Sequence, residues 1–357
     1  MSRFLAPSLA GLAPYVPGEQ PRGIAGLLKL NTNENPFPPS PRVTAALTQA
    51  QTVEDLRLYS DPACADFLAA LAGTFGVGQG QVFASNGSDE ALAFCFAGLC
   101  AQGAAFADVT YGFYPVFAAL YGVQADIVPL RADWRLAVED YAGRKGTVFI
   151  ANPNAPTGLA LGLGDIETLL RQDENRLVVV DEAYVDFGAQ SSRALLDRYD
   201  NLLVVGTFSK SRSLAGARLG YAVGSEALIA DLNRVKFSFN PYNVNRLTLL
   251  AGTAALADRD YFDQCRRAVM DARDETARAL RALGFAVTES KANFLFAAPP
   301  APLTGKTYFE RLRQRDILVR WFGAPRTENY VRITVGTDAQ MARLLQATKA
   351  ICKEMGL

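Results

Sequence analysis

The sequence contains no histidine. This absence excludes Ser-His-Asp hydrolysis, Cys-His proteolysis and catalysis by a histidine-bound metal, so general acid–base chemistry falls to lysine, aspartate, glutamate or tyrosine. The sequence also lacks an excess of one charge, because 36 lysine and arginine residues balance 36 aspartate and glutamate residues. Without a net field to attract polyanions, we expect neither a nucleic acid nor a membrane surface as a partner.

Cysteine is scarce, and no apolar run is long. The odd number of cysteines and their apolar surroundings predict small buried side chains rather than disulfides, and their spacing predicts no metal site. They are Cys64, Cys95, Cys100, Cys265 and Cys352. No apolar stretch reaches the length of a membrane span and the first residues lack a signal-peptide pattern, which predicts a cytoplasmic protein. No G-x-G-x-x-G motif follows the early strands, which argues against a nucleotide-dependent dehydrogenase.

Short β-branched strands alternate with helices from residue 82 to residue 210. This alternation predicts an α/β fold with a largely parallel sheet, helices on both faces and active-site groups at the carboxyl ends of the strands. The proline-rich residues 1–40 are predicted to form an extended arm that packs on the small domain or on a partner subunit. Residues 41–245 are predicted to form the large, cofactor-binding domain, and residues 246–357 a smaller α+β domain.

The predicted elements follow this division. Helices are expected over residues 41–51, 66–75, 88–99, 113–121, 165–171, 243–257, 261–283 and 339–355. Late strands are expected over residues 286–288, 293–297, 317–320 and 330–335.

Two ionisable residues follow apolar strands. Lys210 comes shortly after the run at 202–205, where an amine can form a Schiff base with an aldehyde cofactor if its surroundings lower its pKa. Taken alone, such a lysine is more often a solvated loop residue. Asp181 ends another strand, and a buried carboxylate there is costly without a cation or a donor. Its partner is either a lysine or arginine of the protein or a positively charged ligand.

Other strand ends carry groups that fit the same ligand. Ser88 and Asp89 open a helix whose free N–H groups can hold an oxyanion, or they form an ordinary N-cap. Tyr111 can stack on a planar ligand or pack in the core. The segment ANPNAPTG predicts a tight turn that can contain a cis peptide bond. With Tyr184, Ser209 and Arg218, these groups suit a planar, phosphorylated, pyridine-type aldehyde.

Motifs along nearly the whole chain resemble those of the fold type I pyridoxal-phosphate aminotransferases, and within them are similar to the histidinol-phosphate aminotransferases. They are LNTNENPFPPSP (30–41), NGSDEA (86–91), the segment around Tyr111, NPNAPTG (152–158), VVDEAYVDF (179–187), FSKSRSLAGARLGY (208–221), FNPYNVN (239–245), LVRWF (318–322) and NYVRITVGT (329–337). The resemblance implies the fold type I of pyridoxal 5'-phosphate-dependent transferases, with a large domain built on a mostly parallel sheet and a smaller α+β C-terminal domain.

The resemblance also implies roles for individual residues. Lys210 would be the Schiff-base lysine, Asp181 would pair with the pyridinium nitrogen, Tyr184 would donate to the ring oxygen, Tyr111 would lie against the ring, and Ser88, Asp89, Ser209 and Arg218 would hold the phosphate. Tyr59 would reach the phosphate of the neighbouring subunit in a homodimer. The family usually has asparagine before the proline of PTG, where this chain has Ala155. Either Tyr184 contacts the ring oxygen alone, or Asn154 substitutes.

For the substrate, the resemblance implies that Arg332 and Arg320 grip an anionic group and that Tyr15 lines the site. Arginine suits carboxylate and phosphate, although each could instead form a surface ion pair. The implied reaction passes an amino group from histidinol phosphate, or from an aromatic amino acid, to 2-oxoglutarate with ping-pong kinetics in histidine biosynthesis. The alternatives are a phenylalanine or tyrosine aminotransferase and a threonine-phosphate decarboxylase. A non-enzymatic protein on the same scaffold would be expected to have lost Lys210 or Asp181.

Overall fold

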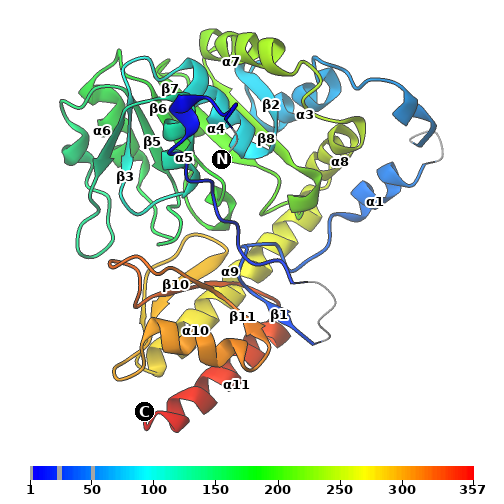
Figure 1. Ribbon diagram of the computed structural model, residues 1–357. Helices are drawn as coiled ribbons and strands as arrows, with labels where there is room; N and C mark the ends of the chain where they lie inside the picture. Colours follow the sequence, from blue (N-terminus) through cyan, green and yellow to red (C-terminus); the bar gives the residue numbers. More distant parts are fainter. Residues whose placement is uncertain (1–2, 22–25, 50–52) are drawn as a thin grey trace.

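A computed structural model describes residues 3–21, 26–49 and 53–357 of the chain. Its main feature is a seven-stranded sheet in the order β2-β8-β7-β6-β5-β3-β4 (Figure 1). The strands are β2 (Val82–Asn86), β3 (Ala104–Ala107), β4 (Ala125–Val128), β5 (Thr147–Ala151), β6 (Val178–Asp181), β7 (Leu202–Thr207) and β8 (Leu219–Gly224). All pairs are parallel except the two that β8 makes with β2 and β7. The predicted mostly parallel sheet is therefore confirmed.

The central strands are buried on both faces. In β6, Val178 and Val180 join one hydrophobic cluster, and Val179 joins another on the opposite face. This follows from the alternation of side chains along a strand, and it explains why the strand reads as a continuous apolar run. Helices from both sides complete the two clusters. They are α3 (Ala65–Phe75), α6 (Leu163–Gln172) and α8 (Arg246–Leu256) on one face, and α4 (Gly87–Gly98), α5 (Phe113–Tyr121) and α7 (Glu226–Phe239) on the other.

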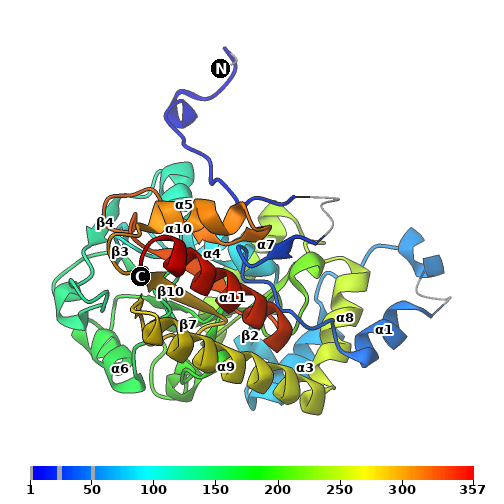
Figure 2. The same cartoon turned by 90° about the horizontal axis from the view of Figure 1, so that it is seen from below.

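A second body of structure follows in the C-terminal part of the chain. Its four-stranded sheet, in the order β12-β13-β10-β9, is antiparallel. The strands are β9 (Ala286–Val287), β10 (Phe294–Ala298), β12 (Arg320–Trp321) and β13 (Val331–Thr334), and the helices are α9 (Arg259–Ala282), α10 (Gly305–Arg313) and α11 (Asp338–Glu354). Figures 1 and 2 show α9 and α11 side by side along this sheet. These elements share a third hydrophobic cluster.

The N-terminal arm joins this second body. Its strand β1 (Leu28–Lys29) pairs in parallel with β11 (Ile317–Leu318). The start of the arm projects from the rest of the chain in Figure 2, and its Phe4 and Val16 are 81% and 71% exposed. Residues 1–2 and 22–25 of the predicted arm lie outside the described residues. The division at residues 40 and 245 stays a prediction.

Besides the two-residue strand β1, the sequence analysis misses three longer elements. It expects no element between residues 221 and 242, where the structure has most of β8 and all of α7, and it also omits α10. β8 contains two glycines, so its composition does not favour a strand. The helix expected over 41–51 is α1 (Pro41–Leu47), and residues 50–52 lie outside the described residues. The five cysteines are free and buried, as predicted.

Among the described residues, no helix is long and apolar enough to cross a membrane. The tight turn predicted after β5 is present, with cis peptide bonds at Asn152-Pro153 and Ala155-Pro156.

We expect Gly220→Ala to lower the thermal midpoint and weaken phosphate binding. Gly220 lies on β8 opposite Ser85, and a Cβ there would fall on backbone atoms of Gly87 and Ser88 at the start of α4. Since backbone cannot move aside cheaply, α4 would shift away from the sheet. The matched control is Gly73→Ala in α3, where a Cβ meets nothing within 4 Å and helix propensity predicts a gain of about 1 kcal/mol. Equal midpoints for the two variants in thermal unfolding would contradict this packing.

Candidate active site

A cavity of about 320 Å³ opens at the carboxyl ends of β5, β6 and β7. Eight of the residues predicted to hold a cofactor line it. They are Ser88, Asp89, Tyr111, Asp181, Tyr184, Ser209, Lys210 and Arg218. These residues come from four separate segments of the chain, and the parallel strands bring three of those segments to one edge of the sheet. We call this space the lysine cavity.

Lys210 enters the lysine cavity from the segment after β7. Its Nζ lies 3.5 Å from the backbone oxygen of Thr32 in the N-terminal arm and 5.8 Å from the centre of the Tyr184 ring. No carboxylate of the described residues forms an ion pair with it. The amine therefore has a weak anchor and is free to react with a ligand in the cavity.

Asp181 is the last residue of β6 and is only 5% exposed. Its carboxylate accepts hydrogen bonds from the Tyr114 hydroxyl at 3.2 Å and from the Ala183 backbone N–H at 3.2 Å. No lysine or arginine of the described residues pairs with it, and burial raises the pKa of Asp181 to about 6. A buried carboxylate without a cation is costly, so this position fits a ligand that brings a positive charge.

An anion site lies at the other end of the lysine cavity, at the start of α4. The Arg218 guanidinium contacts the Asp89 carboxylate at 2.9 Å and the Ser209 hydroxyl at 3.5 Å. Gly87 has a φ of 73°, and a Cβ there would collide with the Arg218 guanidinium. Glycine thus lets a fixed cation, a hydroxyl and the N–H groups of a helix start converge, which suits an oxyanion such as phosphate.

Asp89 organises this end through its side chain. Besides Arg218, its carboxylate accepts a hydrogen bond of 2.6 Å from the Tyr111 hydroxyl, which fixes the Tyr111 ring at the wall of the cavity. Burial and the neighbouring Asp89 charge raise the pKa of Tyr111 well above its ordinary value. Tyr111 therefore stays neutral and keeps donating to Asp89. The three parts of the lysine cavity together fit a phosphorylated pyridine aldehyde: an anion site, an unpaired carboxylate and a lysine amine.

A wider cavity of about 660 Å³ adjoins the lysine cavity and shares Tyr111, Tyr184, Lys210 and Arg218 with it. The three predicted substrate residues line its outer part: Tyr15, Arg320 and Arg332. The Arg332 Nη2 donates to the backbone oxygen of Asn31 at 3.1 Å, and its Nε is buried without a partner among the described residues. Burial lowers the pKa of Arg332 from its ordinary value. Such a guanidinium has donors left for a substrate anion.

The other two predicted substrate residues take part in contacts between the arm and the rest of the chain. Arg320 donates from its guanidinium to the backbone oxygens of Val16 and Pro17, at 3.2 and 3.4 Å. The Tyr15 ring stacks on Phe113 with 4.2 Å between ring centres. The wider cavity thus lies between the arm and the two candidate arginines.

Two of the residues predicted to bind the cofactor do not line the lysine cavity. Tyr59 is 79% exposed and stacks on Tyr242 with 4.5 Å between ring centres. Asn154 faces the other way: its Oδ1 accepts from the Thr110 hydroxyl at 2.8 Å and its Nδ2 donates to the backbone oxygen of Val109 at 2.9 Å. Ala155 lines the cavity instead. The Asn154 amide is thus bound outside the lysine cavity, which favours the alternative in which Tyr184 contacts the ring oxygen alone.

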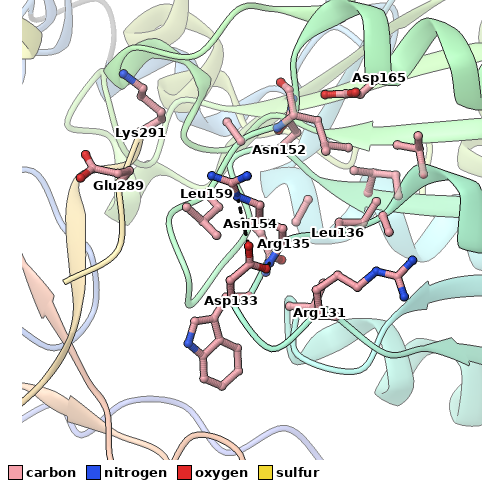
Figure 3. A pocket seen from close by; sticks show the side chains of 18 of the residues that line it. Arg131, Asp133, Arg135, Leu136, Asn152, Asn154, Leu159, Asp165, Glu289 and Lys291 are labelled. Carbon is pink, nitrogen blue, oxygen red and sulfur yellow. Dashed lines mark hydrogen bonds and ion pairs between the residues drawn. The ribbon is translucent and has the colours of Figure 1, made fainter. Parts of the chain in front are cut away.

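A cavity of about 790 Å³ lies beside the same turn and is shown in Figure 3. Its ionisable side chains are all exposed, and Arg135 and Asp133 pair with each other at 3.5 Å. Glu289 and Lys291 approach from the segment between β9 and β10. Neither Lys210 nor Asp181 reaches it, so its size does not make it the reactive site.

Sequence reasoning misses two residues that hydrogen-bond to side chains of the lysine cavity. Tyr114 donates to Asp181 from the first turn of α5, just after the segment of Tyr111, so its closeness in sequence to Tyr111 could have revealed it. Asn33 donates from its Nδ2 to the Tyr184 hydroxyl at 3.0 Å. Asn33 belongs to the motif at residues 30–41, but the sequence does not show its contact with Tyr184, because the two residues are 151 positions apart.

The aminotransferase class I and II family model matches residues 25–347 of the chain. The chain belongs to this family. Histidinol-phosphate aminotransferase 1 of Bordetella parapertussis is 49% identical, over 98% of this chain and 99% of that protein. Histidinol-phosphate aminotransferase 2 of Dechloromonas aromatica is 50% identical, over 98% and 99%. A crystal structure of histidinol-phosphate aminotransferase from Sinorhizobium meliloti in complex with pyridoxal-5'-phosphate is 25% identical, with a TM-score of 0.82 over 92% of this chain and 91% of that one.

These comparisons confirm the fold and the class of enzyme that the sequence predicts. The chain has the fold type I of pyridoxal 5'-phosphate-dependent transferases and is an aminotransferase of a family that depends on this cofactor. The roles of the individual site residues stay predictions.

We expect Asp181→Asn to stabilise the ligand-free chain at pH 8. Burial raises the pKa of Asp181 from 3.8 to about 6, so the folded chain binds this proton more tightly than the unfolded chain. The free-energy cost of the buried charge is present in full above pH 6. It disappears below the pKa that Asp181 has in the unfolded chain. The variant should gain about 3 kcal/mol at pH 8, and the gain should fade between pH 6 and pH 4. Urea unfolding at several pH values measures it.

The same variant should bind pyridoxal 5'-phosphate more weakly than the wild type, because its amide cannot balance a ring cation. The matched control is Glu182→Gln. Glu182 is also buried, with a pKa raised to about 7 by burial, but it accepts from Ser191 and does not line the lysine cavity. Unchanged cofactor affinity in Asp181→Asn would refute the role given to this carboxylate.

Proposed function

We propose that the chain transfers the amino group of histidinol phosphate to 2-oxoglutarate, with pyridoxal 5'-phosphate as cofactor, in histidine biosynthesis. The observation that carries the proposal is the lysine cavity, where a free amine, an unpaired buried carboxylate and an anion site meet. The choice of substrate is supported by the two relatives of that name, which match almost the whole chain at 49% and 50% identity.

The residues divide the work of holding the cofactor. The start of α4 at Ser88 and Asp89, with Ser209 and Arg218, would hold the phosphate. Asp181 would face the ring nitrogen, Tyr184 the ring oxygen, Tyr111 a ring face and Lys210 the aldehyde carbon. Bound there, the cofactor supplies a carbon that combines with amines and a ring that withdraws electrons from the substrate's α-carbon.

The chain's own groups perform the proton chemistry. Lys210 Nζ would take the proton from the substrate's α-carbon. It would then deliver this proton to the former aldehyde carbon of the cofactor. Asp181 keeps a positive charge on the ring nitrogen, because its own charge is buried and forms no direct ion pair with a lysine or arginine of the described residues. Arg332 and Arg320 bind the anionic end of the substrate in the wider cavity, and Tyr15 lines it.

The proposal includes a homodimer in which Tyr59 reaches the phosphate of the neighbouring site. Tyr59 is exposed and lies outside both cavities of its own chain, although it belongs to the predicted cofactor residues. Exposed apolar side chains on the projecting arm also favour a partner chain. The amino donor and 2-oxoglutarate would be the small-molecule partners, and a cytoplasmic location stays part of this proposal.

We expect Lys210→Ala to lose the visible absorption of bound cofactor and to reduce turnover by a factor of ~10³ or more, because both the amine and the proton carrier are removed. Lys291→Ala is the matched control, since that exposed lysine lines the cavity of Figure 3 instead. The assay pairs 2-oxoglutarate with histidinol phosphate, phenylalanine, tyrosine or aspartate. Faster turnover of an aromatic amino acid than of histidinol phosphate would refute the proposed substrate.

Mixing two inactive variants tests the dimer. In a hybrid of Lys210→Ala and Tyr59→Ala chains, one site keeps both wild-type residues if Tyr59 acts on the neighbouring subunit. Random pairing makes half of the dimers hybrids, so co-expressed chains should recover about a quarter of wild-type turnover. Each variant expressed alone is the control. No recovery in hybrids purified with two different tags would place Tyr59 outside the neighbouring site.

A further inference from the structure

Three consecutive arm residues each contact a different group of the site. The backbone oxygen of Asn31 accepts from Arg332 at 3.1 Å, and that of Thr32 accepts from Lys210 at 3.5 Å. Asn33 contributes its side chain and donates to the Tyr184 hydroxyl at 3.0 Å. Of the three residues, only Asn33 acts through its side chain, so only this contact depends on the residue type.

The orientation of the Asn33 amide is fixed by Thr334. The Thr334 hydroxyl accepts from the Asn33 backbone N–H at 2.9 Å and donates to the Asn33 Oδ1 at 3.1 Å. A hydroxyl has one proton, and the backbone N–H can only donate. If the amide were turned over, Nδ2 would face the Thr334 hydroxyl, and the hydroxyl proton would lose Oδ1 as its acceptor. The hydrogen bond from Thr334 to Oδ1 therefore favours the orientation in which the Asn33 Nδ2 donates to Tyr184.

This donor determines what the Tyr184 hydroxyl can do. Asn33 is its hydrogen-bond partner among the described residues, and it fills an acceptor position of the hydroxyl oxygen. The ring of Tyr184 is fixed as well, edge-on to Phe294 with 5.0 Å between ring centres. The hydroxyl proton is left over, and it can only be donated into the lysine cavity, which Tyr184 lines.

The residue type at position 33 fits this task. Asn33 has a φ of 55°, a left-handed conformation that asparagine, aspartate and glycine adopt most readily. Among these three, asparagine alone has both the acceptor that Thr334 needs and the donor that faces Tyr184. The side chain is buried, at 1% exposure, so water does not compete for either bond. Ala155, which also lines the cavity, offers no side-chain donor in its place.

We propose that Asn33 is a positioning residue that makes Tyr184 a one-way hydrogen-bond donor to the ring oxygen of the cofactor. The inference rests on the proposed function, because it takes the cofactor to lie in the lysine cavity. Asn33, a residue of the arm, thus orients the hydroxyl that donates to the ring oxygen, whereas Ala155 has no side-chain donor for that oxygen. A hydrogen bond to that oxygen favours its charged form and weakens its hold on a nearby proton.

The test is the pH midpoint at which the visible absorption of the cofactor-loaded protein changes. Tyr184→Phe should raise the midpoint by about one pH unit, because the ring oxygen loses its donor. Asn33→Gly keeps the backbone conformation, removes the amide and should shift the midpoint in the same direction. Thr334→Val leaves Asn33 and Tyr184 in place, frees the amide to turn and should give a smaller upward shift.

The double variant separates positioning from a merely structural role. Asn33→Gly should have no further effect on the midpoint in a Tyr184→Phe background, because its target is gone. Additive shifts, or no shift in either Asn33→Gly or Thr334→Val, would overturn the inference.

The control is Asn293→Ser, which removes the amide that donates to the Asn33 backbone oxygen at 3.0 Å but does not touch Tyr184. A shift equal to that of Asn33→Gly would mean that seating of the arm is the cause, and the inference would fall. A wild-type protein without any visible band would instead refute the proposed function.

Discussion

The structure is organised around a buried charge that forms no direct ion pair, the carboxylate of Asp181. It stands at the end of a strand that is apolar on both faces, so the sheet that positions it also removes it from water. Two hydrogen bonds hold it in place without neutralising it. The protein tolerates this cost because a folded chain needs only a small net stability, and the missing cation can come from a bound ligand.

The antiparallel strand β8 brings the anion site to the same cavity. Arg218 precedes β8 directly, and β8 pairs with β2, which leads into α4. The pairing of these two strands therefore sets the distance between the arginine and the helix start. Glycines at positions 87 and 220 remove the side chains that would separate them. A charge at one end of the cavity and a phosphate site at the other fix the direction in which a ligand can lie.

How far the sequence predicts this arrangement depends on how many positions separate the two residues of each contact along the chain. Asp181, Lys210 and Arg218 were predicted because each stands at a strand end that can be read from a few neighbouring residues. Whether Asn154 faces the cavity could not be decided from the sequence, because only the folded turn shows that its neighbour Ala155 takes the cavity-lining position. β8 was missed because its stability comes from its two neighbours in the sheet rather than from its own composition. Asn33 was missed because its partners are 151 and 301 positions away.

The arm can dock only after the large sheet has been synthesised. Asn33 leaves the ribosome among the first residues, but Thr334 and Asn293 are made 301 and 260 positions later. A growing chain can assemble the seven-stranded sheet before those partners exist, and the arm must wait unattached in the meantime. The contacts that seat Asn33 beside Tyr184 are therefore complete only when translation is almost finished.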